Sequence, residues 1–437
     1  MPIQYPQTQE IERMTNAIRD FGNLKSEYGS RPEDIAKVLE TLKSNMKGAL
    51  DALLRLPEDA GLAAREPNGL PEILALRPNP PRRLWESFNA GAYGDRLAGA
   101  FIGRLAGCTL GAPVEFWEPG DMKAWAEWTG DEFPPKDYWS EVKNPNTLRY
   151  QVSRCIDYTR GKLDGVPVDD DTTYTLLGLL IAEEYGLGFT IEDAGKAWMK
   201  YLPYACTAEE VALRNLNAGC SALRSADIDN PYVQWIGADI RSDPWGYIAP
   251  GLPEKAADMA WRDAWLSHRR NGIYGEMYFS AVIAAAFAVD DPVEALRIGL
   301  NYIPADCLLA NDIRWALEQG RDISGHASAR NAVEHRFGDM SGVHTNLNAC
   351  LTIFGLMIGG DDFSRCIGET VAMGYDNDCT AATAGSIFGA AKGLAMIPGH
   401  WYERFNNKVY TYINGYPCFD IDDVLRRFAA LAKRAFD

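Results

Sequence analysis

Residues 96–115 read RLAGAFIGRLAGCTLGAPVE, and residues 381–393 read AATAGSIFGAAKG. Small residues recur at every fourth position: Gly99, Gly103, Gly107 and Gly111 in the first stretch, and Ala381, Gly385, Gly389 and Gly393 in the second. A glycine inside a helix costs about 1 kcal/mol relative to alanine, so this repetition needs a compensating reason. A spacing of four places these residues on one helix face, where the missing side chains allow another backbone to come close. The pattern therefore predicts two tightly packed core helices at the centre of an all-α domain.

Helical patterns also dominate the rest of the chain, and alternating patterns typical of strands are scarce. We expect helices at about residues 9–21 and 30–56, followed by a proline-rich linker that includes Pro67 and Pro81. The length of 437 residues allows one large domain or a few smaller ones. We therefore predict an N-terminal helical extension with its linker over residues 1–85 and a compact multi-helix domain over residues 86–437.

The charge of the chain limits its partners. It has 43 Lys and Arg against 60 Asp and Glu, which gives a formal net charge of −17. A general nucleic-acid binder needs clustered basic side chains, and an anionic membrane surface attracts basic segments, so we expect neither partner. The glycine-rich segments are interrupted by Arg104 and Lys392, and we expect them to be too short to span a bilayer.

The cysteines indicate a reducing compartment. The nine cysteines stand at irregular spacings without a C-x-x-C pair, which argues against a disulfide framework and a zinc knuckle. The first residues lack a basic segment followed by an apolar run, so we expect no signal peptide. The expected location is the cytoplasm.

Two acidic clusters stand where helices are expected to begin. The first contains Asp169, Asp170 and Asp171, and the second contains Asp376 and Asp378. One or two acids at a helix start are ordinary capping residues, but five would repel one another if the clusters meet. Hard oxygen ligands without His or Cys spacing favour Mg²⁺, Mn²⁺ or Ca²⁺ over zinc. From the residues alone, a metal site and a set of solvated capping acids both remain open.

Two further segments carry candidate functional residues. Glu115 follows Pro113 at the end of the first glycine-rich segment, so we expect it on a loop at the mouth of that helix. His268 precedes the run of small apolar residues from Ala281 to Ala288. A lone surface glutamate and a structural histidine at a helix end are the ordinary explanations of these two residues.

In this order, the segments resemble the ADP-ribosylglycohydrolase family. The family's glycine-rich opening helix with its terminal Glu is matched by residues 96–115, and its T-D-D-T motif by residues 169–172. Its G-x-D-x-D-T/S motif and the glycine-rich helix that follows are matched by residues 374–390. Shorter matches are Gly-Ala-x-x-Arg at residues 237–241, Ser-His at 267–268 and Ile-Pro at 397–398. The resemblance covers about residues 90–405.

The resemblance implies a compact all-α fold and a site for two Mg²⁺ or Mn²⁺ ions. The metal candidates are the five clustered acids, of which the family motifs supply four as ligands: Asp170, Asp171, Asp376 and Asp378, with Asp169 beside them. Glu115 would be the acid that gates the substrate or assists water. The segments around Gly237 and His268 would contact ADP-ribose, which gives the substrate-binding candidates Gly237, Ala238, His268, Gly275 and Glu276.

Three residues depart from the family pattern. Asp169 and Cys379 stand where the family has Thr, and Cys108 stands where it has Asp. Magnesium disfavours thiol ligands, so we expect Cys379 not to coordinate it. An insertion at about residues 118–167, rich in Trp and Pro, could also reshape the pocket.

The resemblance leads to three functional hypotheses. The first is a metal-dependent hydrolase that releases ADP-ribose from a protein, nucleic-acid or small-molecule acceptor. The second is a glycosidase acting on another furanoside or a nucleoside, and the third is a catalytically silent ADP-ribose-binding protein. The sequence specifies neither the acceptor nor the oligomeric state.

Overall fold

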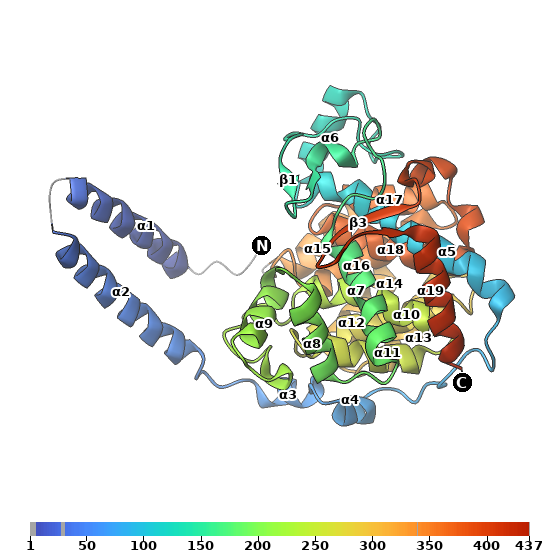
Figure 1. Cartoon of the computed structure of the whole chain (residues 1–437), viewed down its shortest axis with the longest axis horizontal. Helices are drawn as coiled ribbons and strands as arrows, with labels where there is room; N and C mark the ends of the chain where they lie inside the picture. The colour runs from blue at the N-terminus through green and yellow to red at the C-terminus, as the bar shows by residue number, and fades with distance from the viewer. Residues whose placement is uncertain (1–5, 28–30, 339, 437) are drawn as a thin grey trace. The chain divides into compact units, whose positions relative to one another are not determined.

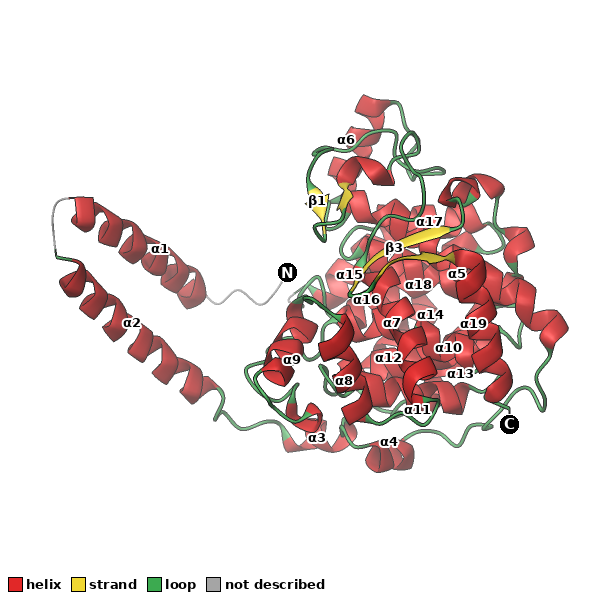
Figure 2. Cartoon of the chain, viewed as in Figure 1, coloured by secondary structure: helices red, strands yellow, loops and turns green. Residues whose placement is uncertain are grey.

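The computed structural model describes residues 6–27, 31–338 and 340–436. In these ranges the chain is mainly helical, as Figure 2 shows, and its strands form two short antiparallel pairs. The strands are β1 (Leu148–Arg149), β2 (Ser153–Arg154), β3 (Lys408–Ile413) and β4 (Tyr416–Asp420). The all-α prediction is confirmed.

Figure 1 labels the helices in chain order. The helices before residue 200 are α1 (Pro6–Glu27), α2 (Pro32–Leu53), α3 (Ala60–Arg65), α4 (Leu70–Leu76), α5 (Ala90–Gly111), α6 (Pro119–Thr129), α7 (Asp170–Tyr185) and α8 (Ile191–Tyr201). The following ones are α9 (Thr207–Asn217), α10 (Asp243–Ile248), α11 (Pro253–Ala264), α12 (Asn271–Ala286), α13 (Pro292–Gly299) and α14 (Leu308–Gln319). The last are α15 (His326–Phe337), α16 (Thr345–Gly359), α17 (Phe363–Ala372), α18 (Asn377–Lys392) and α19 (Ile421–Arg434).

Short 3₁₀ helices connect several of these elements. They are Ala112–Val114, Cys155–Tyr158, Ala222–Arg224, Ile236–Arg241, Leu300–Tyr302, Leu394–Met396, Gly399–Trp401 and Glu403–Phe405.

The chain divides into two compact units, of which the first runs to Ala64 and the second continues from Arg65, and the domain boundary near residue 85 stays a prediction. Residues after Ala64 pack on the main unit: Ile73 is fully buried, and the indole of Trp261 donates a 2.9 Å hydrogen bond to the carbonyl of Asn68. The proline-rich stretch packs there too, because the carbonyl of Pro81 accepts a 2.7 Å hydrogen bond from Tyr302. The expected linker is therefore part of the main unit.

The first unit contains α1, α2 and all of α3 except Arg65, together with Met340 and Ser341. Helices α1 and α2 match the segments expected at residues 9–21 and 30–56, although the expected start at residue 30 lies outside the described residues. None of the α2 side chains is buried, and Val38 and Leu53 are more than 60% exposed.

The glycine-rich helices α5 and α18 cross in direct backbone contact at the centre of the main unit. A Cβ atom added to Gly103 would lie 2.2 Å from the carbonyl oxygen of Gly385, and the reverse distance is also 2.2 Å. A Cβ on Gly107 would lie 2.1 Å from the carbonyl oxygen of Ala381. The predicted close packing is confirmed. Gly393 has a different role, since it caps α18 with a φ of +82°.

Helix α5 is long enough to cross a membrane, so the expectation that the glycine-rich segments are too short to span a bilayer is wrong for this helix. Residues Ala90–Val114 form the one helix, within the described ranges, that is long and apolar enough to cross a membrane. Of its most apolar window, 89% is buried inside the protein. Composition and length alone therefore do not separate this core helix from a membrane-spanning one.

Candidate active site

The crossing of α5 and α18 brings the two acidic clusters together. At the end of α5, a Cβ on Gly111 would lie 2.5 Å from the Cα atom of Asp378, so the end of α5 touches the start of α18. The chain then makes one 3₁₀ turn and reaches Glu115. Helix α7 begins at the same place, with Asp169 as its N-cap. Backbone packing thus joins α5 to α18, and ligand atoms of Asp169 and Asp171 at the start of α7 lie within 4.8 Å of that of Cys108 on α5.

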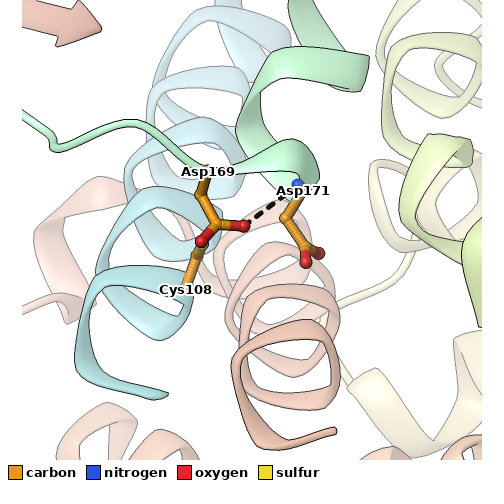
Figure 3. Close-up of side chains that lie close together, drawn as sticks. All are labelled: Cys108, Asp169 and Asp171. Atoms are coloured by element: carbon orange, nitrogen blue, oxygen red, sulfur yellow. Dashed lines mark hydrogen bonds between the residues drawn. The ribbon is translucent and has the colours of Figure 1, made fainter. Parts of the chain in front are cut away.

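The aspartates of the two clusters are mostly buried. Asp169 and Asp171 are fully buried, and Asp376 and Asp378 are less than 10% exposed. Figure 3 shows Asp169 and Asp171 at the start of α7, where the Asp171 N–H donates a 3.1 Å hydrogen bond to Asp169 Oδ1, beside Cys108 of α5. The thiol of Cys379 donates to Asp171 Oδ2 over 3.1 Å and joins the two clusters.

Burial and mutual repulsion destabilise the charged forms of these carboxylates. Burial raises the pKa of Asp171 well above its ordinary value, and the negative charge of Asp169 adds to this effect. Burial also raises the pKa of Asp378, with Glu115 and Asp169 as the main charged neighbours. Positive charge placed among these groups would lower both pKa values, so the cluster favours a cation.

Arg104 of α5 supplies one such charge. It is fully buried, and its guanidinium donates to Asp171 Oδ1 over 3.1 Å, to the Asp171 carbonyl over 2.8 Å and to Asp243 Oδ2 over 2.6 Å. Two anionic partners hold its pKa above the ordinary value despite the cost of burial. Arg104 therefore fixes Asp171 from the side of the core.

Arg149 supplies a second charge from the insertion. Its Nη1 donates to Glu115 Oε2 over 2.9 Å and to the Ala112 carbonyl over 3.0 Å. Its Nη2 donates to Asp169 Oδ2 over 2.9 Å and to Asp378 Oδ2 over 3.3 Å. One guanidinium thus binds a carboxylate from each of the three segments that form the site.

Tyr150 follows Arg149 into the site. Its hydroxyl donates a 2.6 Å hydrogen bond to Asp170 Oδ1, and its ring stacks on Tyr412 with centroids 5.5 Å apart. The hairpin of β1 and β2 therefore brings two consecutive polar side chains to the acidic cluster.

Glu115 lies after the 3₁₀ turn, as expected from Pro113, and is partly exposed. Burial raises its pKa to about 7, while Arg149 acts in the opposite direction. A carboxyl with a pKa near neutrality can both accept and donate a proton at the pH of a cell, as a general acid or base requires.

A cavity of about 260 Å³ opens over the cluster. Its carboxyl residues are Glu115, Asp170, Asp171, Glu209, Asp376 and Asp378. Its aromatic lining consists of Phe116, Tyr150, Tyr174 and Trp235. Asp169 and Arg149 do not line the cavity and pair with each other behind it.

Comparison with known proteins identifies the family. A family model described as ADP-ribosylglycohydrolase matches residues 89–435. The chain belongs to the ADP-ribosylglycohydrolase family. Forty-five chains of solved structures match it, and no curated protein does. One of these structures, named "ADP-ribosylglycohydrolase-related protein complex", is 20% identical, with a TM-score of 0.47, and the match covers 79% of this chain and 99% of the other.

Membership of the ADP-ribosylglycohydrolase family supports an enzyme with glycohydrolase function and a ribosyl substrate. Members of the family are metal-dependent. In the described part of this chain, ligand atoms gather in two groups within 4.8 Å: Cys108, Asp169 and Asp171, and Asp376, Asp378 and Cys379.

The cavity carboxylates fit a hard divalent cation. Carboxylate oxygens are the ligands that Mg²⁺ and Mn²⁺ prefer, and the buried Asp378 Oδ1 accepts no hydrogen bond. The thiol of Cys379 is a hydrogen-bond donor to Asp171, so it orients a carboxylate and is not needed as a ligand.

Of the residues expected to bind substrate, only Gly237 lines the cavity. Ala238, His268, Gly275 and Glu276 are buried and do not line the cavity; they lie in the protein wall of which Gly237 forms the surface. Glu276 forms an ion pair with Arg241, at 3.3 Å, and accepts a 2.9 Å hydrogen bond from the Trp245 indole. A Cβ on Gly275 would lie 1.9 Å from Asp239 Oδ1, so this glycine allows close packing of the wall. In this structure these residues support the wall, and substrate contact by the four stays a prediction.

Sequence reasoning missed the two arginines and most of the aromatic lining. Arg104 stands inside the glycine-rich segment, and Arg149 and Tyr150 stand inside the insertion that could reshape the pocket. The seven residues before Arg104, from Leu97 to Gly103, are all apolar or small. A charged residue directly after such a run was the available signal for Arg104. We find no comparable sequence signal for Arg149.

Proposed function

We propose that this chain hydrolyses the bond between the ribose of ADP-ribose and an acceptor. The observation that carries the proposal is the cavity, where five carboxyl groups from the three segments described above, together with Glu209 of α9, face one small space. Cleavage at the ribose C1″ passes through an oxocarbenium-like state, which negative charge nearby stabilises.

The cavity suits a ribosyl group better than the whole ligand. Its volume of about 260 Å³ lies below the usual range of sites that enclose a drug-sized molecule. Phe116, which is 53% exposed, lines both this cavity and a neighbouring surface groove with Trp117, Trp125 and Trp128. The ribose would therefore be enclosed, and the rest of the substrate would extend past Phe116.

Asp170, Asp171, Asp376 and Asp378 would hold the divalent cation, which we propose to be Mg²⁺ or Mn²⁺. When bound, such a cation binds ribose hydroxyls and lowers the pKa of a water molecule. It also reduces the local negative charge, which favours the approach of a pyrophosphate to a chain with a net charge of −17.

Glu115 would act as the general base. Its carboxyl faces the cavity, and a bound cation would lower its pKa from the value of about 7 that burial produces, so its charged form can take a proton from the attacking water. Arg149 fixes Glu115 Oε2 through a 2.9 Å hydrogen bond, so the orientation of this carboxyl is set by the insertion.

We also propose that the protein works in a reducing compartment such as the cytoplasm. All nine cysteines are free, and several, including Cys108 and Cys379, are buried. Free thiols persist where the surroundings keep them reduced.

The test is release of ADP-ribose from arginine-, serine- and DNA-linked substrates with added Mg²⁺ or Mn²⁺. We expect turnover with at least one linkage, its loss on chelation, and no turnover by the Asp376→Ala/Asp378→Ala variant. Turnover that a chelator leaves unchanged would refute the metal dependence. Activity confined to other furanosides or nucleosides would identify the second hypothesis as correct, and tight ADP-ribose binding without turnover would identify a silent binder.

A further inference from the structure

Arg149 lies where a cation would be expected among acidic ligands. Its two terminal nitrogens are within 3.3 Å of carboxylate oxygens of Glu115, Asp169 and Asp378. Its side chain is 16% exposed, and the Asp169 and Asp378 side chains are at most 3% exposed. This corner of the cluster is therefore nearly closed to water and already contains one positive charge.

The position of Arg149 is fixed by its surroundings. Its guanidinium lies over the Tyr158 ring at 5.7 Å and over the Tyr150 ring at 5.5 Å. A fourth acceptor, the Ala112 carbonyl, binds Nη1 over 3.0 Å. Displacing this side chain would break four hydrogen bonds and leave three carboxylates facing one another, so it is part of the site.

Two departures from the family pattern agree with this arrangement. Asp169 replaces a neutral threonine, and the added negative charge is paired with Arg149 at 2.9 Å. Cys379 replaces a second threonine, and its thiol donates to Asp171 where a hydroxyl oxygen could have been a ligand. The Asp at position 169 therefore accompanies the positive charge of Arg149, and the Cys at position 379 removes a hard oxygen ligand.

We propose that the Arg149 guanidinium takes the place of one of the two divalent ions that the family resemblance implies. The chain then binds a single divalent cation, on the cavity side, among Asp170, Asp171, Asp376 and Asp378. A second ion bound by Asp169 and Asp378 would need their carboxylate oxygens at about 2.0–2.1 Å for Mg²⁺, but Arg149 Nη2 already lies 2.9 Å and 3.3 Å from these two carboxylates. The Arg149 nitrogens occupy that space, and their charge repels another cation.

This inference rests on the proposed cation site and is independent of which glycoside is cleaved. It assigns Arg149 as a positioning residue, because it acts through Glu115, Asp169 and Asp378. A structural role alone would leave the number of bound ions unchanged when Arg149 is replaced.

The experiment counts Mn²⁺ ions on the full chain after metal removal. Isothermal titration gives the number of sites, and electron paramagnetic resonance detects spin coupling between two adjacent Mn²⁺ ions. We expect one uncoupled Mn²⁺ for the unmodified chain and two coupled ions for Arg149→Gln. Arg154→Gln, in the same hairpin but paired with Asp157, is the matched control and should bind one.

A second variant guards against misfolding of Arg149→Gln. The double variant Arg149→Gln/Asp169→Thr removes the paired charges together and restores the neutral hydroxyl, and it should also bind two coupled ions. Two coupled ions on the unmodified chain, or only one on both Arg149 variants, would overturn the inference and leave the proposed function standing. Absence of Mn²⁺ binding in every protein would refute the proposed cation site as well.

Discussion

Replacing Gly103 with alanine tests the packing that positions the site. The added Cβ would lie 2.2 Å from the carbonyl oxygen of Gly385, whereas ordinary contacts to a Cβ begin near 3.4 Å. The obstacle is backbone, so no rotamer change relieves it. Helices α5 and α18 would have to separate by about 1 Å to restore normal contact distances.

The magnitude follows from two opposing effects. Alanine gains about 1 kcal/mol of helix propensity over glycine. Overpacking a rigid core costs about 1–3 kcal/mol, and a backbone-to-backbone clash belongs at the upper end. We expect Gly103→Ala to lower the free energy of unfolding by about 2 kcal/mol, the difference between these two effects.

Gly94→Ala is the matched control, because Gly94 lies on the same helix and its Cβ would meet no atom within 4 Å. It should raise the free energy of unfolding by up to about 1 kcal/mol. Urea denaturation compares the two variants. The Gly103→Ala/Gly385→Ala double variant should lose less stability than the sum of the single variants, because both added Cβ atoms force the same separation of α5 and α18. A Gly103→Ala variant as stable as Gly94→Ala would refute the account of the glycine pattern.

Three further changes probe the electrostatics of the site. Asp378→Asn should raise the urea midpoint of the metal-free chain at pH 7, because burial and neighbouring acids raise the pKa of Asp378 and make its charged form unfavourable; an unchanged midpoint in chelator would contradict this. Burial lowers the pKa of His344 to about 4, so unfolding takes up a proton between about pH 6.5 and 4 and stability falls as the pH falls through that window. His344→Asn, which keeps an acceptor for the Asn346 N–H, should remove up to about 3 kcal/mol of this loss, measured as the difference in unfolding free energy at pH 7 and pH 4.5. Glu115→Gln should lower the rate of ADP-ribose release about 10²- to 10⁴-fold, and a rate within threefold of the unmodified chain would exclude Glu115 as the proton carrier.

The parts of the fold that sequence could predict have local patterns. The glycines at a spacing of four specify a helix face and require another backbone against it, whatever lies elsewhere in the chain. The acids at the starts of α7 and α18 have the same property, because a helix N-terminus fixes which side chains stand together. The glycine pattern therefore predicted the core and the acid patterns predicted each cluster, whereas the meeting of the two clusters was implied by the family resemblance.

The parts that sequence could not predict depend on the path of irregular segments. Arg149 stands 34 residues from Glu115 and 229 residues from Asp378, and no periodicity relates the three. Prolines likewise predict extended backbone, but they do not specify whether that backbone packs against the rest of the protein. The hydrogen bond from Tyr302 to the Pro81 carbonyl shows that it does here. Glu276 was assigned to substrate from its place in a motif, while its partner Arg241 lies 35 residues away.

Arg104 and Arg149 bind the acidic cluster from two different sides. Arg104 belongs to α5, is fully buried and contacts Asp171 from the core, so the helix crossing that forms the site also supplies its first positive charge. Arg149 comes from an insertion and contacts the opposite corner at Asp169. Arg149 thus reaches the acids from the short β1–β2 hairpin, whereas Arg104 reaches them from a core helix. If Arg149 takes the place of one divalent ion, as we propose, the number of ions bound depends on this hairpin as well as on the helices that carry the acidic ligands.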